Sequence, residues 1–274
     1  TDGHLFIGNA VDNGAVAAIV EKKLDTPITQ LLVTDSVRAL GLLAKYVVAK
    51  VRSFGNLKVV AVTGSNGKTT TKNMLRQILS EFGPTVAPQE SYNNVVGAPY
   101  SMLRVNQDTK YLVLEYGADG LGSISHLVDI CKPDIAVELK VGMAHAGVFG
   151  GIDETEKIKA ELVKDLDSSD LAVLNLDDPR VAQMANLTRA KVITFGTNPE
   201  ATFRADGIRV SISGTYFDLL APEGFFKPVQ LQILGEHHVY NALASLAVTW
   251  ALDLDLNVAI NALQAMSLAE RWRM

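Results

Sequence analysis

Residues 59–70 read VVAVTGSNGKTT, and this stretch decides the fold. Its first five residues are apolar or β-branched, as in a strand that is buried on both faces. A short loop from Gly64 to Gly67 separates that strand from a helix that opens with Lys68. Glycines let backbone N–H groups approach a ligand closely, and the N-terminus of a helix favours negative charge. The stretch therefore predicts a loop that binds phosphate groups.

The side chains that follow the glycines suit a nucleoside triphosphate. Lys68 would neutralise the β- and γ-phosphates, and the Thr69 hydroxyl would ligate Mg²⁺. The loop residues expected to bind ATP are Gly64, Ser65, Asn66, Gly67, Lys68, Thr69 and Thr70. The fuller phosphate-loop pattern has another glycine at the position of Val62. A plain strand–helix turn is one alternative, and a dinucleotide-binding turn is another, although the latter has no use for a Lys-Thr pair.

Strands and helices alternate on the C-terminal side of this loop. Apolar strands are expected at residues 59–63, 111–115, 135–139, 171–175 and 192–195, although Glu138 interrupts the third. An amphipathic helix lies between the first two strands. This order predicts the α/β class, with a mostly parallel sheet flanked by helices. Residues 203–234 alternate between apolar and polar and predict a β-hairpin region, and helices are expected at 239–251 and 256–265.

The first 56 residues predict a separate small α/β unit. Short apolar strands are expected at residues 16–20 and 30–33, followed by a helix that Ser36 would cap. Residues 52–56 have the composition of a linker, so we expect a domain boundary there and a second domain at 57–274. The chain begins without Met and ends abruptly after Arg273, so we expect it to be a piece of a longer protein.

Composition excludes several classes of protein. The net charge of −5 comes from intermixed acidic and basic residues, which argues against non-specific binding of nucleic acid. The longest uncharged stretch, residues 239–252, is shorter than the roughly 20 residues of a membrane span, and no signal peptide is found. The single cysteine, Cys131, allows no internal disulfide and is interpreted as a structural thiol. A cytoplasmic protein is expected.

Two further side chains follow strands of the predicted sheet. Glu115 ends the strand 111–115, and His145 follows the strand 135–139. Ligands of open α/β sheets bind beyond the carboxyl ends of the strands, so both side chains are expected at the phosphates. A carboxylate there can hold Mg²⁺ directly or through water. For His145 the alternative is a structural histidine, and for Glu115 it is a solvated residue at the end of a strand.

With these motifs together, the sequence resembles the Mur ligases of peptidoglycan synthesis. Beyond the loop and Glu115, the shared features extend over nearly the whole chain: Asp2-Gly3-His4, Asn93-Asn94-Val95-Val96-Gly97-Ala98-Pro99, Val141-Gly142 with His145, Lys159-Ala160-Glu161, Asp177-Asp178, and His237 with Asn241-Ala242-Leu243. The Asn-Asn-x-x-Gly-x-Pro segment favours the branch of this family that joins D-alanyl-D-alanine to a UDP-N-acetylmuramoyl tripeptide.

The resemblance implies a reaction and a set of roles. ATP would phosphorylate the terminal carboxylate of the tripeptide, and the amine of D-alanyl-D-alanine would attack the acyl phosphate. Thr69 and Glu115 would hold a first Mg²⁺, and His145 a second, together with a carbamylated Lys159. Without the family, Lys159 would be interpreted as an exposed helical charge. Asn241 would contact the adenine, and Arg273 (or Arg271) the ribose and phosphates. Asn93 and Asn94 would bind the peptide substrate.

The resemblance also implies an architecture, and the sequence departs from the family at two positions. Residues 1–56 would be the C-terminal part of a UDP-substrate domain, 57–274 the central ATP-binding domain, and the family's C-terminal domain would be absent. The protein would be a monomer. Lys140 and His238 stand where the family usually has asparagine, which affects the expected nucleotide affinity. Alternatives are a ligase that adds a single amino acid, a polyglutamate-type ligase, and a catalytically silent relative that binds nucleotide.

Overall fold

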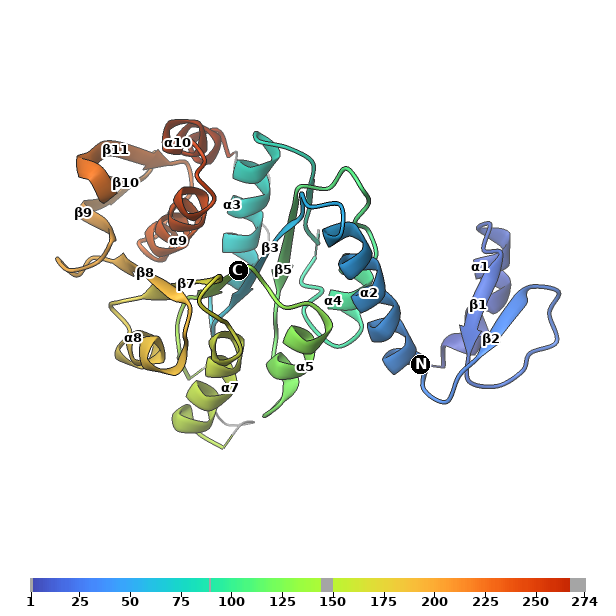
Figure 1. The fold of residues 1–274 in the computed structure, drawn as a ribbon. Coiled ribbons are helices and arrows are strands. Elements are labelled where there is room, and N and C mark those ends of the chain that lie inside the picture. Colours follow the sequence, from blue (N-terminus) through green and yellow to red (C-terminus); the bar gives the residue numbers. More distant parts are fainter. Residues whose placement is uncertain (1, 89, 144–149, 267–274) are drawn as a thin grey trace.

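A computed structural model describes residues 2–88, 90–143 and 150–266. Its main feature is a nine-stranded sheet with the strand order β11-β10-β9-β8-β7-β6-β3-β5-β4 (Figure 1). The strands from β4 to β9 pair in parallel, which confirms the predicted α/β class with a mostly parallel sheet. Their bounds are β3 Lys58–Thr63, β4 Thr85–Val86, β5 Tyr111–Glu115, β6 Ile135–Glu138, β7 Leu171–Asn175, β8 Lys191–Gly196 and β9 Phe203–Ser211.

Helices cover both faces of this sheet, so the strands between them are apolar throughout. One core lies under α3 (Lys68–Ser80), α9 (His237–Ala251) and α10 (Leu256–Ala265). A second core lies under α2 (Ser36–Arg52), α4 (Gly97–Met102), α5 (Ser123–Ile130), α7 (Ile152–Lys164) and α8 (Pro179–Gln183), after which a 3₁₀ turn follows at Met184–Leu187. Within β3, Val60 and Val62 face the first core and Val59 and Ala61 face the second.

The predicted hairpin region contains antiparallel strands that extend the sheet. Strand β9 pairs with β10 (Gly214–Ala221), and β10 pairs with β11 (Phe225–Leu231) after a 3₁₀ turn at Pro222–Gly224. Gly214 has a φ of 138°, and a Cβ there would lie 2.2 Å from the Leu231 carbonyl oxygen. A residue with a side chain would therefore separate β10 from β11.

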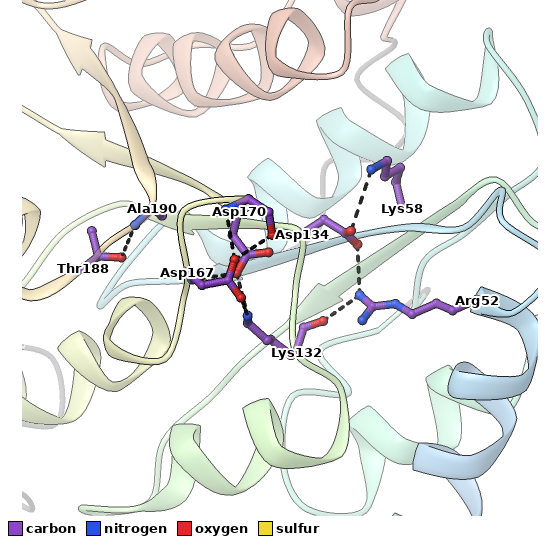
Figure 2. A network of polar contacts seen from close by, with 9 residues as sticks. Arg52, Lys58, Lys132, Asp134, Asp167, Asp170, Thr188 and Ala190 are labelled. Atoms are coloured by element: carbon purple, nitrogen blue, oxygen red, sulfur yellow. Dashed lines mark hydrogen bonds and ion pairs between the residues drawn. The ribbon is translucent and has the colours of Figure 1, made fainter.

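A network of polar side chains connects the amino-terminal ends of the central strands (Figure 2). The phosphate loop follows the opposite, carboxyl-terminal end of β3. Asp134 accepts a hydrogen bond from the backbone N–H of Val59 at 2.8 Å and from the guanidinium of Arg52 at 2.9 Å. Arg52 also donates to the carbonyl of Lys132, whose ammonium pairs with Asp167 and Asp170. Arg52, which the sequence assigned to a linker, is the last residue of α2.

The N-terminal unit is small and has little core of its own. It contains a 3₁₀ turn (Gly3–Phe6), α1 (Ile7–Asp12) and the parallel strands β1 (Ala17–Val20) and β2 (Thr29–Leu32), and it lies at one end of the molecule (Figure 1). Helix α2 connects it to the large sheet. The prediction that Ser36 caps α2 is wrong. The Asp35 carboxylate caps the helix by accepting from Arg38 N–H, and the Ser36 hydroxyl donates to Glu21.

No helix within the described ranges has both the length and the apolar character that crossing a membrane requires. Cys131 follows the last residue of α5 and is buried in the second core. Burial raises the pKa of its thiol to about 11, which agrees with its interpretation as a structural residue.

Candidate active site

The phosphate loop between β3 and α3 requires its two glycines. Gly64 has a φ of 143°, and a Cβ there would lie 2.9 Å from the Leu139 side chain. Gly67 has a φ of 87°, and a Cβ there would lie 2.5 Å from the side-chain oxygen of Asn241. Residues with side chains are strained in this backbone region and have no room here. The loop is therefore held between the end of β6 and the start of α9.

The segment after β6 anchors the loop from one side. Ser65 N–H donates to the carbonyl of Lys140 at 2.7 Å, and the Ser65 hydroxyl accepts from Gly142 N–H at 2.8 Å. The segment is itself fixed by Asp178, which accepts from Val141 N–H at 2.9 Å. The side chain of Lys140 is exposed. The substitution at this position thus leaves the backbone support of the loop in place.

Lys68 and Thr69 open α3 and lie beside the end of β5. The Lys68 ammonium donates to the carbonyl of Gly64 at 2.8 Å, so it lies over the loop. The Thr69 hydroxyl donates to the Glu115 carboxylate at 3.0 Å. Glu115 is 1% exposed, which rules out its interpretation as a solvated strand end. Carboxylate and hydroxyl oxygens next to a phosphate loop are the ligands that Mg²⁺ prefers, so this pair fits that ion.

The second oxygen of Glu115 connects the loop to the segment before α4. Asn93 donates its side-chain amide to that oxygen at 2.8 Å, and its own carbonyl accepts from Gly117 N–H. The side chain of Asn94 instead accepts from the N–H groups of Val96 and Gly97, so it shapes the start of α4. The structure thus places the Asn93 side chain against Glu115, whereas the Asn94 side chain binds only the backbone at the start of α4.

A buried lysine ties the same segment to α3. Lys72 is fully buried and donates to the carbonyls of Pro88 and Glu90 at 2.6 and 3.2 Å. It lies one helical turn after Lys68. Sequence reasoning missed this contact, because a lysine in the second turn of a helix after a phosphate loop is indistinguishable from a solvated one.

Lys159 belongs to α7 and reaches the site from the face of the sheet opposite to α3. It is 4% exposed, and its ammonium donates to the Thr63 hydroxyl at 3.3 Å. Burial lowers its pKa to about 8, although the neighbouring Glu138 opposes that shift. A lowered pKa increases the share of neutral amine, which is the form that reacts with carbon dioxide. A carbamate on Lys159 therefore fits the chemistry of this position.

Glu138 is a site residue whose role sequence reasoning missed. It ends β6 opposite Thr63, is 0% exposed, and neither carboxyl oxygen has a hydrogen-bond partner among the described residues. Burial raises its pKa to about 8, and Lys159 and Lys68 act in the opposite direction. A charged residue that ends an otherwise apolar buried strand was the available signal, since the equivalent end of β5 carries Glu115.

The start of α9 borders the loop on its other side. Asn241 is buried, and its side-chain oxygen accepts from the Thr71 hydroxyl at 3.3 Å, whereas its amide nitrogen has no partner among the described residues. The rings of His237 and His238 lie 4.0 Å apart between centroids. Burial lowers the pKa of His238 to about 4, with His237 contributing in the same direction. The neutral ring of His238 is therefore the stable form here at neutral pH.

Two predicted site residues, His145 and Arg273, lie outside the described residues. Within the described part of the chain, no three His, Cys, Asp or Glu side chains form a metal-binding group.

Comparison with known proteins shows which family the chain resembles. Residues 62–249 match the family model of the Mur ligase middle domain. The UDP-N-acetylmuramoyl-tripeptide–D-alanyl-D-alanine ligase of Escherichia coli is 34% identical over 93% of this chain and 56% of its own length. The Mycobacterium leprae ligase of the same name is 33% identical over the whole chain and 59% of its own length. This chain therefore spans less than two thirds of these relatives.

Two solved structures of ligases from this family have a similar fold. The crystal structure of MurF from Acinetobacter baumannii has a TM-score of 0.88 and 34% identity, and the match covers 97% of this chain and 58% of that one. The MurF ligase of Thermotoga maritima, solved in complex with ADP, has a TM-score of 0.83 and 30% identity, covering 97% of this chain and 60% of that one.

Proposed function

Because the chain belongs to the Mur ligase family, we propose that it forms part of an ATP-dependent ligase that joins D-alanyl-D-alanine to a UDP-N-acetylmuramoyl tripeptide. Residues 1–56 are assigned to the C-terminal part of the UDP-substrate domain and 57–274 to the central ATP-binding domain. The reaction belongs to the cytoplasm, where ATP is available, and the working unit is a monomer.

One observation carries the proposal. The carboxylate of Glu115 accepts from Thr69 of the phosphate loop at 3.0 Å and from Asn93 at 2.8 Å. One buried side chain thus contacts both the nucleotide loop and the segment that we assign to the peptide substrate. A ligase needs this proximity, because the γ-phosphate and the substrate carboxylate must meet. Relatives that are named for this activity are 33–34% identical to the chain over 93–100% of its length.

The proposed chemistry has two steps. The terminal carboxylate of the tripeptide attacks the γ-phosphorus of ATP, giving an acyl phosphate and ADP. The amine of D-alanyl-D-alanine then attacks the acyl carbon, loses a proton, and inorganic phosphate leaves. Lys68 and the N–H groups of the loop stabilise the charge on the transferred phosphoryl group. Asn241 is assigned to the adenine of ATP, and Arg273 to its ribose and phosphates.

Thr69 and Glu115 would hold one Mg²⁺, and His145 and a carbamylated Lys159 would hold a second. When bound, these ions would neutralise phosphate charge and polarise the transferred group. A carbamate would convert the Lys159 ammonium, which repels a cation, into an oxygen ligand. The burial of Lys159 and its lowered pKa support this assignment.

A panel of acceptor and amine substrates, assayed with the full-length protein, tests the proposal. Phosphate release is expected only when ATP, the UDP-muramoyl tripeptide and D-alanyl-D-alanine are all present. Release with a single amino acid in place of the dipeptide would instead assign the chain to a sibling ligase, as would release with a polyglutamate acceptor. Nucleotide binding without turnover on any substrate would identify a catalytically silent relative.

A further inference from the structure

Glu138 is a buried carboxylate that the proposed mechanism does not use. It lies in register with Thr63 of β3 and with Leu174 of β7, at the carboxyl edge of the sheet. Ala136, two residues earlier on the same face, belongs to the core that also contains Ile158 of α7. The Glu138 side chain therefore points to the α7 face, where Lys159 enters the site.

Within the described ranges, no donor reaches the carboxyl oxygens of Glu138. Both are inaccessible, and neither has a hydrogen-bond partner among the described residues. The two nearby ammonium groups donate elsewhere, Lys159 to the Thr63 hydroxyl and Lys68 to the Gly64 carbonyl. Buried polar atoms without partners are rare in folded proteins, and they are often completed by an ion or by water.

The surroundings of Glu138 favour a cation as the missing partner. Lys68 and Lys159 both lie within electrostatic range of Glu138, and the proposed function places these lysines beside the phosphates and the second Mg²⁺. Protein sites for Mg²⁺ combine one or two carboxylates with phosphate oxygens and water. Glu115 supplies one carboxylate on the α3 face of the sheet. Glu138, on the α7 face, offers a second carboxylate, and its oxygens have no hydrogen-bond partner among the described residues.

We propose that Glu138 is an additional oxygen ligand of the cation held beside Lys159, bound directly or through one of the cation's water molecules. The inference rests on the proposed function, because that cation accompanies the nucleotide. With Lys159 carbamylated, the two anionic groups would be held together by the cation between them. The competing role is an ion pair with an unmodified Lys159, with no contact to the cation.

Mn²⁺ titration of the intact protein with a non-hydrolysable ATP analogue separates these roles. Bound Mn²⁺ is measured by electron paramagnetic resonance in the wild type and in Glu138→Gln, which keeps the shape and removes the charge. Glu138→Val is a second variant that suits the apolar strand, and circular dichroism of both variants checks that they fold. Glu115→Gln reports on the proposed site itself, and Glu154→Gln, on the surface of α7, is the matched control.

Loss of this ligand is expected to weaken Mn²⁺ binding by about 10-fold or more in Glu138→Gln and Glu138→Val, with Glu154→Gln unchanged. Mn²⁺ affinities within twofold of the wild type in both Glu138 variants would overturn the inference, and a lower melting temperature in those variants would then assign Glu138 to the ion pair. If Glu115→Gln binds Mn²⁺ weakly while the Glu138 variants bind normally, only this inference fails. If the wild type binds no Mn²⁺–nucleotide, the proposed function itself fails.

Discussion

Lys68 is placed to act by charge and not by packing. It is half-buried, begins α3, and its ammonium lies over the loop against the Gly64 carbonyl. Lys68→Ala should therefore lower the rate of ATP turnover by at least about 100-fold while the protein stays folded. Phosphate release by the intact enzyme, beside circular dichroism, measures both effects. Lys45→Ala, an exposed lysine on α2, is the control, and near-normal turnover in the Lys68 variant would refute the phosphate-loop assignment.

Lys159 differs from Lys68 because its proposed role needs a covalent modification. A Lys159→Ala enzyme should turn over weakly and recover part of its activity with added short carboxylic acids, since these can supply the oxygen ligand that the carbamate would provide. The exposed Lys157, on the same helix, gives the control variant Lys157→Ala, which should need no acid. Full activity of Lys159→Ala without added acid would count against the carbamate.

His238 makes the stability of the protein depend on pH. Its pKa is lowered from 6.5 to about 4 in the folded state, mainly by burial. A group with a lowered folded pKa stabilises the folded state above pH 6.5, and this contribution is lost as the pH falls toward 4. Because the ring is partly exposed, we expect the loss to be about 1–2 kcal/mol. Urea unfolding at pH 7.5 and pH 4.5 measures it, and His238→Gln, but not the exposed His126→Gln, should reduce the difference.

The sequence predicts those site residues whose position follows from the residues next to them in the chain. The phosphate loop and Glu115 follow directly from strand ends and glycine spacing. Burial of Lys159 depends on helices that are distant in sequence, although its spacing from Thr155 and Leu162 does place it on the apolar face of α7. The unpartnered state of Glu138 depends on where two lysines from other elements donate, and no local pattern records that.

At the scale of elements, one carboxylate of α7 binds the start of α5, in addition to the apolar contacts of the second core. Glu161 accepts hydrogen bonds from the backbone N–H groups of Gly122, Ile124 and Ser125, at 2.6, 3.1 and 2.9 Å. These groups lie at the N-terminus of α5, where no side chain of that helix caps them. The carboxylate also complements the positive end of the helix dipole. Glu161 therefore positions the helix that carries Lys159.

Glu161→Ala should lower the free energy of unfolding by about 2–4 kcal/mol, because it leaves these backbone donors without an acceptor. Urea denaturation measures the change. Glu154→Ala on the same helix removes only a surface pair with Lys157 and should change stability by less than about 0.5 kcal/mol. Equal effects of the two substitutions would show that the α5 contact contributes little.

The central strands could be predicted because strands buried on both faces are apolar along their whole length. Strand β11 is harder to predict from the sequence, because it contains Pro228 and proline argues against a central strand. Pro228 lies opposite Asp218 of β10, and β11 is an edge strand of the sheet, where proline is tolerated. The position of a strand at an edge is a property of the assembled sheet, so the sequence predicts a hairpin region but not the number of its strands.

At the scale of the whole molecule, the N-terminal unit and the large sheet differ in how many of their residues are buried. Among residues 2–35 only Val20 and Ile28 are buried, whereas β3, β5 and β6 are covered on both faces. Amides of β1 and β2 in residues 1–274 should therefore exchange with solvent at least about 100-fold faster than those of β3 and β5. Hydrogen exchange followed by mass spectrometry measures this. Equal protection in both sheets would show that α2 couples them into one cooperative unit.

Glu115 is shared between the two halves of the site, and that has a thermodynamic consequence. If nucleotide binding changes the position or charge of this carboxylate, the hydrogen bond to Asn93 changes with it. By linkage, the free energy by which bound ATP would change the affinity for the proposed peptide substrate equals the free energy by which that bound substrate would change the affinity for ATP. Cooperativity between the two ligands is then reciprocal, so the equilibrium affinity for each rises or falls by the same factor when the other is bound.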